Sequence, residues 1–524
     1  MREAVLAAGA AATLAALLAW IVPPSGDLAA HMYQRAVFLD DGFELWSNFW
    51  YGGRYSFVTY SVIYYPLAGV LGIEPLAVAS IATAALAFAV VVGREWGPLA
   101  KWSSRTFAVV WTGLMFSAAF PFALGVALGL LALWALQGGS RWRFALLALL
   151  TLLASPLAFL LLVVVLAGIA LGERPQRLLV PVLIVVAVGA VHFLLLRAFA
   201  DEARYPFPFY ELLPALAFSV LGAALTWRVE RAPVLRWLFI AYLPVVLAAY
   251  VVPSALGGNI ARLRFAAIPI CVLALSLRGW RPRWMAAGAL ALAAAWNLSP
   301  MAWSYSRAQA DRDANPAYWQ PAIEYLNEHL TPSYRVEAVD TLNHWPAVHL
   351  PRAGIPLARG WYRQDDFPQN ELLYKPMQPH AYVRWLRGLG VRYVVSSDTP
   401  PDWSAKHEAT LLESGRSGLR PVFRSAHLTI YAVSRPRPIV TGPGTPEVVD
   451  IGQGHMILRL DRPGRYRIAI RHSPYWSSTA GCVTRGWDRM IRFDARRAGL
   501  MTLRFRVKAG RALAAVVGAG PPSC

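Results

Sequence analysis

The sequence predicts a polytopic α-helical membrane protein of about 11 transmembrane helices, followed by an extracytoplasmic α/β domain and a small β-sandwich. Of its 524 residues, 56% are hydrophobic, and the mean hydropathy is positive. Long apolar runs recur throughout residues 1–300. Charge is sparse there, with 20 Lys+Arg and 12 Asp+Glu, against 30 and 18 in residues 301–524. These observations predict a membrane part followed by a water-soluble part.

The composition divides the chain into three predicted domains. Residues 1–300 form the transmembrane domain, whose first outer loop covers residues 23–74. Residues 301–435 are expected to form the α/β domain. Residues 436–524 begin with a linker marked by Pro436, Pro438 and Gly442-Pro443-Gly444, and they are expected to form the β-sandwich.

The first apolar run, residues 4–22, is long enough to cross a bilayer. Residues 57–72 are apolar but aromatic, and they are interrupted by Pro66 and Gly69, which favours an interfacial or re-entrant helix. Residues 75–92 then return across the membrane. We expect the chain to emerge at Asp27 on the outer side.

Basic residues in the short loops predict the orientation. Thirteen of them fall in five loops that would share one side, whereas the outward connections contain few. Loops rich in Lys and Arg remain cytoplasmic. We therefore expect a plasma-membrane protein with a cytoplasmic N-terminus and everything after Pro300 outside. The thirteen residues are Arg94, Lys101, Arg105, Arg141, Arg143, Arg174, Arg177, Arg228, Arg231, Arg236, Arg278, Arg281 and Arg283.

The second half of the chain has the periodicity of a soluble protein. Helical spacing of apolar residues predicts helices over Ala317–Leu330 and Tyr382–Leu389. Short β-branched and aromatic runs predict the strands of the α/β domain, and alternating runs predict those of the sandwich. The predicted strands are Arg335–Val339, Arg392–Ser396, Leu428–Val433, Met456–Leu460, Tyr466–Ile470, Met490–Phe493 and Leu500–Val507.

Asp27 and His31 are the candidate catalytic residues. A carboxylate at the membrane edge can act as a general base for an attacking hydroxyl. In a helix, Asp27, His31 and Arg35 would share one face. His31 could orient the carboxylate or help it to hold a divalent cation such as Mg²⁺ or Mn²⁺. The structural alternative is that Asp27 caps a helix or pairs with Arg35.

The outward segment 257–264 is the candidate phosphate-binding site. Its Arg262 and Arg264 lie on the predicted outer side, where the orientation rule expects few basic residues, and Gly257 and Gly258 precede them. Arginine makes bidentate contacts with phosphate, and neighbouring backbone amides can add donors. The alternative is that the two arginines extend to the membrane interface or contact the outer domain.

Further polar and aromatic residues are candidates for binding a sugar or an acceptor. In the first loop they include an acidic pair that would equally suit a solvated turn. In the outer domain they combine aromatic rings with side chains that can make paired hydrogen bonds. The same residues would also suit packing of this domain against the membrane part. The candidates are Asp40, Asp41, Trp50, Tyr51, Arg54, Trp361, Arg363 and Asp365.

Several classes of function are disfavoured by the motifs that the sequence lacks. It has no Gly-x-Gly-x-x-Gly and no phosphate-loop motif, so a soluble nucleotide cofactor is not expected. The common hydrolase signatures are also missing. The net charge of +20 comes partly from loops between apolar runs, so we do not expect nucleic-acid binding. The three cysteines match no metal site, and only Cys482 and Cys524 could form a disulfide outside.

The predicted architecture resembles the GT-C superfamily of membrane glycosyltransferases. Asp27 and His31, followed by Trp50-Tyr51-Gly52-Gly53 and Tyr64-Tyr65-Pro66, are also similar to the GT-C-related bacterial membrane proteins labelled pyruvoyl-tetrahydropterin-synthase-related. The Trp-Trp-Asp motif of oligosaccharyltransferases is absent, so transfer to asparagine is not expected. The acidic pair that many relatives carry in this loop is reduced here to Asp27 or to the displaced Asp40-Asp41.

The resemblance implies an inverting glycosyltransferase with a polyprenyl-phosphate-linked sugar donor, working at the outer face of the membrane in cell-envelope glycan, glycolipid or glycoprotein assembly. Asp27 would be its base, and Arg262 or Arg264 would neutralise the departing lipid phosphate. Its partners would be that donor, a glycan or lipid acceptor, and membrane lipid. The alternatives are a transporter or flippase of lipid-linked sugar and a non-catalytic scaffold that binds envelope glycan.

Overall fold

The computed structural model describes residues 1–24, 26–172, 179–309 and 311–518. Arg174, Arg177 and Cys524, which the sequence analysis singled out, lie outside these ranges. The chain folds into two compact units. Unit 1 comprises Met1–Leu28, Tyr60–Phe193 and Arg204–Gln309, and unit 2 comprises Ala29–Thr59, Leu194–Ala203 and Ala310–Cys524.

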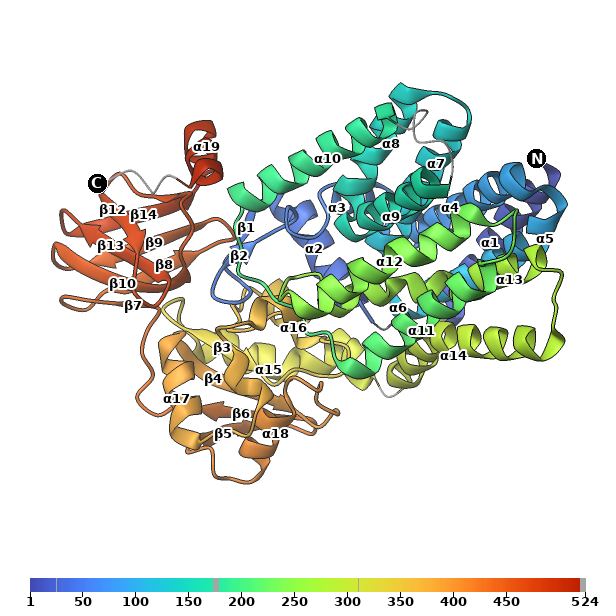
Figure 1. The fold of residues 1–524 in the computed structure, drawn as a ribbon. Helices are drawn as coiled ribbons and strands as arrows, with labels where there is room; N and C mark the ends of the chain where they lie inside the picture. Colours follow the sequence, from blue (N-terminus) through green and yellow to red (C-terminus); the bar gives the residue numbers. More distant parts are fainter. Residues whose placement is uncertain (25, 173–178, 310, 519–524) are drawn as a thin grey trace. The chain divides into compact units, whose positions relative to one another are not determined.

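Unit 1 is a bundle of apolar helices (Figure 1). In the described ranges, eight helical segments are long and apolar enough to cross a membrane, which confirms the predicted polytopic class. The eight are Arg2–Ile21 (α1), Ile73–Ser117 (α4 to α6), Phe120–Gln137 (α7), Leu179–Ala198 (α10), Phe209–Thr226 (α11), Pro233–Val251 (α12), Gly257–Leu277 (η4 and α13) and Arg283–Ala308 (α14).

The difference between these eight and the predicted eleven has two physical causes. The segment Ile73–Ser117 contains α4 (Ile73–Trp96) and α5 (Lys101–Val110), because Gly97, at φ +57°, and Pro98 interrupt it. Two further apolar helices are shorter than a full span, namely α8 (Arg141–Ala154) and α9 (Pro156–Gly172). The aromatic segment expected to be re-entrant or interfacial contains the short helix α3 (Tyr64–Leu71).

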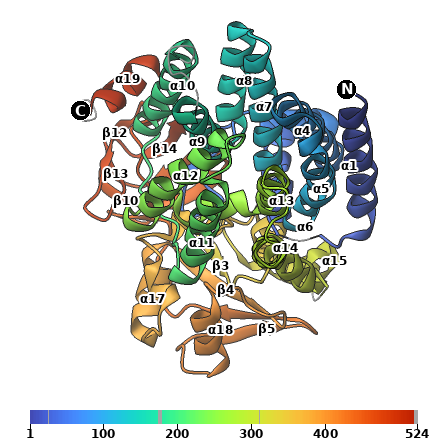
Figure 2. The same ribbon diagram turned by 45° about the vertical axis from the view of Figure 1, so that its right-hand side comes forward.

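Small side chains let the helices of unit 1 approach closely. In α1 the buried residues are Ala4, Ala7, Ala11 and Ala15, which lie on one face by their helical spacing. This face packs against α4 and α5, as Figure 2 shows. Small residues at three- and four-residue spacing are typical of contacts between membrane helices.

The first part of unit 2 after residue 310 is a four-stranded mixed sheet with the strand order β3-β4-β6-β5. Strands β3 and β4 are parallel, and the other pairs are antiparallel. All three strands and both helices predicted in this region are confirmed. The elements are α15 (Pro316–His329), β3 (Arg335–Ala338), α16 (Pro346–Arg352), α17 (Pro379–Gly388), β4 (Val391–Ser397), α18 (Lys406–Glu413), β5 (Arg420–Arg424) and β6 (Leu428–Ala432).

Two antiparallel four-stranded sheets follow, with the orders β12-β13-β10-β7 and β11-β14-β9-β8, and they share one apolar core. This confirms the predicted sandwich. The predicted linker already contains its first strand, β7. The elements are β7 (Val440–Thr441), β8 (Glu447–Ile451), β9 (His455–Leu460), β10 (Gly464–Arg471), β11 (Trp476–Ser477), β12 (Gly481–Arg485), β13 (Met490–Ala495), β14 (Gly499–Phe505) and α19 (Ala509–Val517).

A segment from the predicted first outer loop belongs to unit 2. It contains α2 (Leu28–Asp41) from its second residue on and a small hairpin formed by β1 (Trp46–Ser47) and β2 (Arg54–Tyr55). The ring of Trp46 lies inside the sandwich core, 5.1 Å from the ring of Phe505 and 5.9 Å from that of Trp476. This hairpin is therefore a structural part of the sandwich.

Candidate active site

Asp27 is held through its own backbone and that of Gly26, which both lie against Ser117. Gly26 has a φ of +60°, and a Cβ built on it would lie 2.3 Å from the carbonyl oxygen of Ser117. The Asp27 amide donates a hydrogen bond of 3.0 Å to that same oxygen. Only glycine tolerates both the left-handed conformation and this close approach. Gly26 therefore fixes the position of the Asp27 backbone, from which the carboxylate side chain extends.

Arg262 lies in η4 (Gly257–Ala266), a 3₁₀ segment that leads into α13 (Ala267–Leu277). A Cβ at Gly257 would lie 2.0 Å from the carbonyl oxygen of Tyr205, so the two backbones touch directly. The hydroxyl of Tyr242 donates a hydrogen bond of 2.7 Å to the carbonyl of Ile260. The glycines that suggested phosphate binding thus serve to seat this segment against its neighbours.

The structure brings Asp27 and Arg262 together across 235 positions of the sequence. Arg262 Nη2 donates to Asp27 Oδ2 at 3.0 Å, and the two side chains are 17–18% exposed. The guanidinium carbon lies 6.0 Å from the centre of the Phe122 ring. Both residues belong to unit 1. A carboxylate and a permanent cation therefore share one partly solvated position.

Arg262 also lines an apolar cavity of about 610 Å³ within unit 1. The cavity follows α7 from Phe122 to Gln137, a path of roughly 22 Å at 1.5 Å per residue. Most of its wall consists of Leu, Val, Ile, Phe and Trp side chains. At its far end lie Arg94 and Glu95. An arginine in the wall of a long apolar cavity, with a carboxylate paired to it, suits a ligand with a polar head and a hydrocarbon tail.

Arg264, the other candidate for phosphate, does not line this cavity. Its Nε is buried and has no hydrogen-bond partner within the described ranges. Its guanidinium carbon lies 5.8 Å from the ring centre of Phe265. Between the two arginines that the sequence left open, Arg262 is the one that adjoins both Asp27 and the cavity.

His31 is fully buried in α2 and belongs to unit 2, whereas Asp27 belongs to unit 1. Its predicted role beside Asp27, including the shared metal, therefore stays a prediction. Asp40 and Asp41 are exposed at the end of the same helix. Their position suits the solvated acidic turn that was the alternative interpretation.

The aromatic residues predicted to bind acceptor are buried in unit 2. The indole of Trp50 donates to the carbonyl of Ala347 at 2.9 Å, and the hydroxyl of Tyr51 bonds to the carbonyls of Gly360 and Tyr362 at 2.8 and 2.6 Å. These contacts fasten the segment 29–59 to the α/β part of the same unit. Sugar binding by Trp50 and Tyr51 remains a prediction.

Arg54 and Asp365, two other acceptor candidates, form a buried ion pair. Arg54 Nε lies 2.5 Å from Asp365 Oδ2, both side chains are 2% exposed, and the guanidinium lies over the Tyr362 ring at 4.0 Å. Trp361, next to Tyr362, has a ring-centre distance of 5.8 Å to His344. The structure thus gives these residues internal partners in unit 2.

A cluster that was not predicted from the sequence lies beyond the carboxyl ends of β3 and β4. Asp340, His344 and Asp402 have ligand atoms within 4.8 Å of one another, and theirs is the one metal-compatible group found in the described ranges. Asp340 and Asp402 lie in the loops that follow these two parallel strands, and this position could have revealed the cluster, because ligands commonly bind at this edge of an α/β sheet.

The side chain of Arg363 lies among these three residues. It pairs with Asp340, and it lies 2.5 Å from His344 Nδ1 and 3.3 Å from Asp402 Oδ2. Burial works against ionisation of Asp402, but the Arg363 charge holds the pKa of that carboxyl below its ordinary value. The guanidinium thus supplies the positive charge that the carboxylates need, and the donor set does not call for Mg²⁺ or Mn²⁺.

No family model matches the chain, and no curated protein matches it. It is similar to the solved structure of the arabinofuranosyltransferase AftD from Mycobacteria, with 16% identity and a TM-score of 0.46, over 90% of this chain and 42% of that chain. It is also similar to ArnT from Cupriavidus metallidurans, with 14% identity and a TM-score of 0.40, over 80% of this chain and 96% of that chain.

This chain therefore spans less than half the length of AftD and nearly all of ArnT. The first of the two is an arabinofuranosyltransferase. With TM-scores below 0.5, these are distant likenesses of fold, and neither assigns an activity to this chain.

Proposed function

We propose that this protein is an inverting membrane glycosyltransferase that uses a polyprenyl-phosphate-linked sugar. One observation carries the proposal: Arg262 pairs with Asp27 and also lines the apolar cavity of about 610 Å³. Two parts of such a donor and the reacting group of the acceptor have matching places, since the cation suits the phosphate, the cavity suits the prenyl chain and the carboxylate suits an acceptor hydroxyl.

The proposed reaction is a single displacement at the anomeric carbon. The acceptor oxygen forms a bond to that carbon while the bond from the carbon to the phosphate oxygen breaks. The acceptor proton passes to the carboxylate of Asp27, which acts as general base. Attack opposite the leaving group inverts the anomeric centre.

Arg262 stabilises the leaving phosphate, on which negative charge grows as the bond breaks. A guanidinium that the fold already holds in place is well suited to this task, because it needs little reorganisation when the charge develops. The ion pair also implies an exchange of partners. When the donor phosphate binds Arg262, it competes with Asp27, and the freed carboxylate becomes available as base.

Substitution of the two residues tests the proposal. Asp27→Asn should abolish sugar transfer from a panel of radiolabelled polyprenyl-phosphate sugars, and it should keep the binding of undecaprenyl phosphate measured by thermal shift. Arg262→Gln should lose both. Asp450→Asn, in the exposed strand β8, is the control and should change neither. Full transfer by Asp27→Asn would remove Asp27 from the mechanism.

A flippase of lipid-linked sugar is the second candidate, and the extent of the cavity favours it. The cavity runs along the whole of α7, and charged residues lie at both ends. Reconstituted vesicles distinguish the two functions. Movement of a lipid-linked sugar between leaflets without a new glycosidic bond would support the flippase and contradict the transferase.

A further inference from the structure

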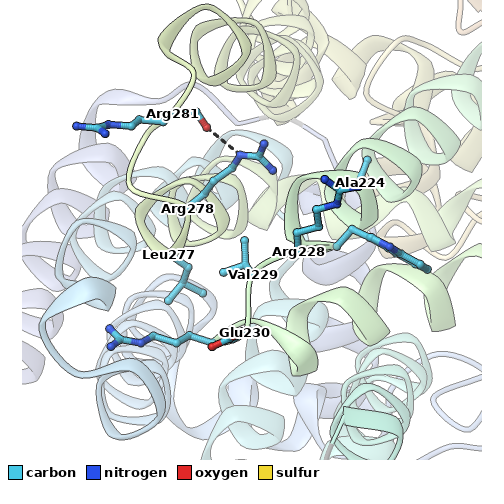
Figure 3. Close-up of a pocket in the computed structure, with 9 residues that line it drawn as sticks. Ala224, Arg228, Val229, Glu230, Leu277, Arg278 and Arg281 are labelled. Atoms are coloured by element: carbon cyan, nitrogen blue, oxygen red, sulfur yellow. Dashed lines mark hydrogen bonds between the residues drawn. The ribbon is translucent and has the colours of Figure 1, made fainter.

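A second pocket, of about 1040 Å³, opens at one end of unit 1 and is strongly basic. Its wall comes from the connections between α11 and α12 and between α13 and α14. Four arginines line it, Arg228, Arg231, Arg278 and Arg281, against one carboxylate, Glu230. Figure 3 shows the side chains of Arg228 and Arg278 pointing toward one another over the pocket, whereas that of Arg281 points away.

This pocket lies far from the Asp27–Arg262 pair. Arg262 is in η4 at the start of the apolar segment Gly257–Leu277, and Arg278 follows the last residue of that segment. Helix α13 alone contributes 11 residues, or roughly 16 Å, to the separation. The two sites therefore occupy opposite ends of one candidate membrane span.

One of the four arginines in this pocket has a structural role, and the other three have none that the described contacts show. Arg278 donates to the carbonyl of Arg281 in the same connection at 2.8 Å and to that of Leu225 in the last turn of α11 at 3.0 Å, so it satisfies a helix-end carbonyl. For the side chains of Arg228, Arg231 and Arg281, no ion pair is found with any described residue. The pocket thus keeps a surplus of positive charge that the fold does not use.

Exposed tryptophans indicate the depth of the pocket relative to the bilayer. Trp227, Trp280 and Trp284 stand in or beside its two connections and are 61%, 38% and 77% exposed. Tryptophan gathers at the level of the lipid head groups, where its ring is apolar and its N–H finds water. The pocket therefore opens where phospholipid phosphates lie.

We propose that this pocket binds the phosphate head group of an anionic phospholipid. Arginine forks recognise phosphate by paired hydrogen bonds, and basic pockets between membrane helices commonly hold such head groups. The apolar side chains of Val229 and Leu277 in the wall suit the glycerol and first acyl carbons. A soluble phosphate would not need a site at this depth. The proposal does not depend on the transferase activity.

Titration of the purified full-length chain with lipid tests the proposal. Binding of phosphatidylglycerol and phosphatidylcholine is measured by native mass spectrometry for the wild type and two variants. Arg228→Gln/Arg231→Gln removes two charges from the pocket. Arg141→Gln/Arg143→Gln removes two exposed charges at the start of α8, outside the pocket, and is the matched control.

The wild type should prefer phosphatidylglycerol, and the pocket variant should bind it about thirtyfold more weakly, from about 1 kcal/mol per arginine. The control variant should stay within about threefold of the wild type. Equal losses in both variants, or displacement of the lipid by excess inorganic phosphate, would overturn the proposal. If the pocket variant does not fold, equal binding of both lipids by the wild type overturns it.

Discussion

At the scale of single residues, burial separates two kinds of ion pair in this protein. Asp27 and Arg262 remain partly solvated, and pairs of this kind add little to stability, typically up to about 1 kcal/mol. Arg54 and Asp365 are almost fully buried, and loss of one partner from such a pair commonly costs about 3–5 kcal/mol. The first pair can therefore exchange partners at low cost, whereas the second is fixed.

Asp313 gives unit 2 a distinctive dependence of stability on pH. Burial raises the pKa of Asp313 from 3.8 to about 7, and the neighbouring charge of Asp311 acts in the same direction. The folded state therefore binds this proton more tightly than the unfolded state does. The resulting contribution to the free energy of unfolding is present at low pH and is lost as the pH rises toward 7. The loss is on the order of 4 kcal/mol.

We predict that Asp313→Asn removes this loss of stability with rising pH. The free energy of unfolding of the variant, relative to the wild type, should rise by a few kcal/mol between about pH 4 and about pH 8. Denaturant unfolding followed by circular dichroism measures this difference. Asp450→Asn, at an exposed carboxylate, should give parallel profiles, and parallel profiles for Asp313→Asn would contradict the raised pKa.

At the scale of elements, two glycine contacts position the candidate active site. Gly26 presses the residue before α2 against Ser117, and Gly257 presses η4 against Tyr205. Neither contact follows from the local periodicity of the helices. Each brings one charged residue to the place where the other can reach it.

Substitution of Gly26 by alanine should therefore reduce sugar transfer by more than the accompanying loss of protein stability explains. A left-handed residue costs about 1–2 kcal/mol when it gains a Cβ, and Gly139→Ala, at φ +74° with open space around it, carries only that cost. Gly26→Ala must also push Asp27 away from Ser117. We expect a loss of sugar transfer for Gly26→Ala alone, larger than its further decrease in melting temperature accounts for. Equal transfer by both variants would separate Gly26 from the site.

The β1–β2 hairpin acts as part of the sandwich core, and we predict that Trp46→Ala destabilises unit 2 by about 3–5 kcal/mol. The same change at Trp487, which is 96% exposed, should stay within about 0.5 kcal/mol. Thermal unfolding compares the two. Limited proteolysis should also cut the segment 42–59 faster in Trp46→Ala, and an unchanged cleavage rate would argue against the core role.

At the scale of the whole molecule, the distribution of charge predicts the orientation in the membrane. Within unit 1, the connections after α4 and α11 lie together, because the Trp96 indole donates to the Arg231 carbonyl at 2.8 Å. Arg278, after α13, reaches the carbonyl of Leu225 in α11. These basic connections thus gather at one end, which is the arrangement that keeps an end of a bundle in the cytoplasm.

Labelling of introduced cysteines checks this orientation. Trp487→Cys, in the sandwich, should react with a membrane-impermeant maleimide in intact cells. Arg143→Cys, in a basic connection, should react only after the membrane is permeabilised. The wild type is the control, and its Cys271 is free and buried. Labelling of Arg143→Cys in intact cells would reverse the proposed topology.

The sequence by itself determined the membrane class and most regular elements of the C-terminal half, because apolar run length and period-2 or 3.6 patterns are local. It also selected Asp27 and Arg262 as candidates, because a charged group near an apolar run is conspicuous. Only the tertiary structure decided that the two residues pair, that Arg262 rather than Arg264 lines the cavity, and that Trp46 belongs to the sandwich. These contacts join positions hundreds of residues apart, and packing between distant segments leaves no periodic trace in the chain.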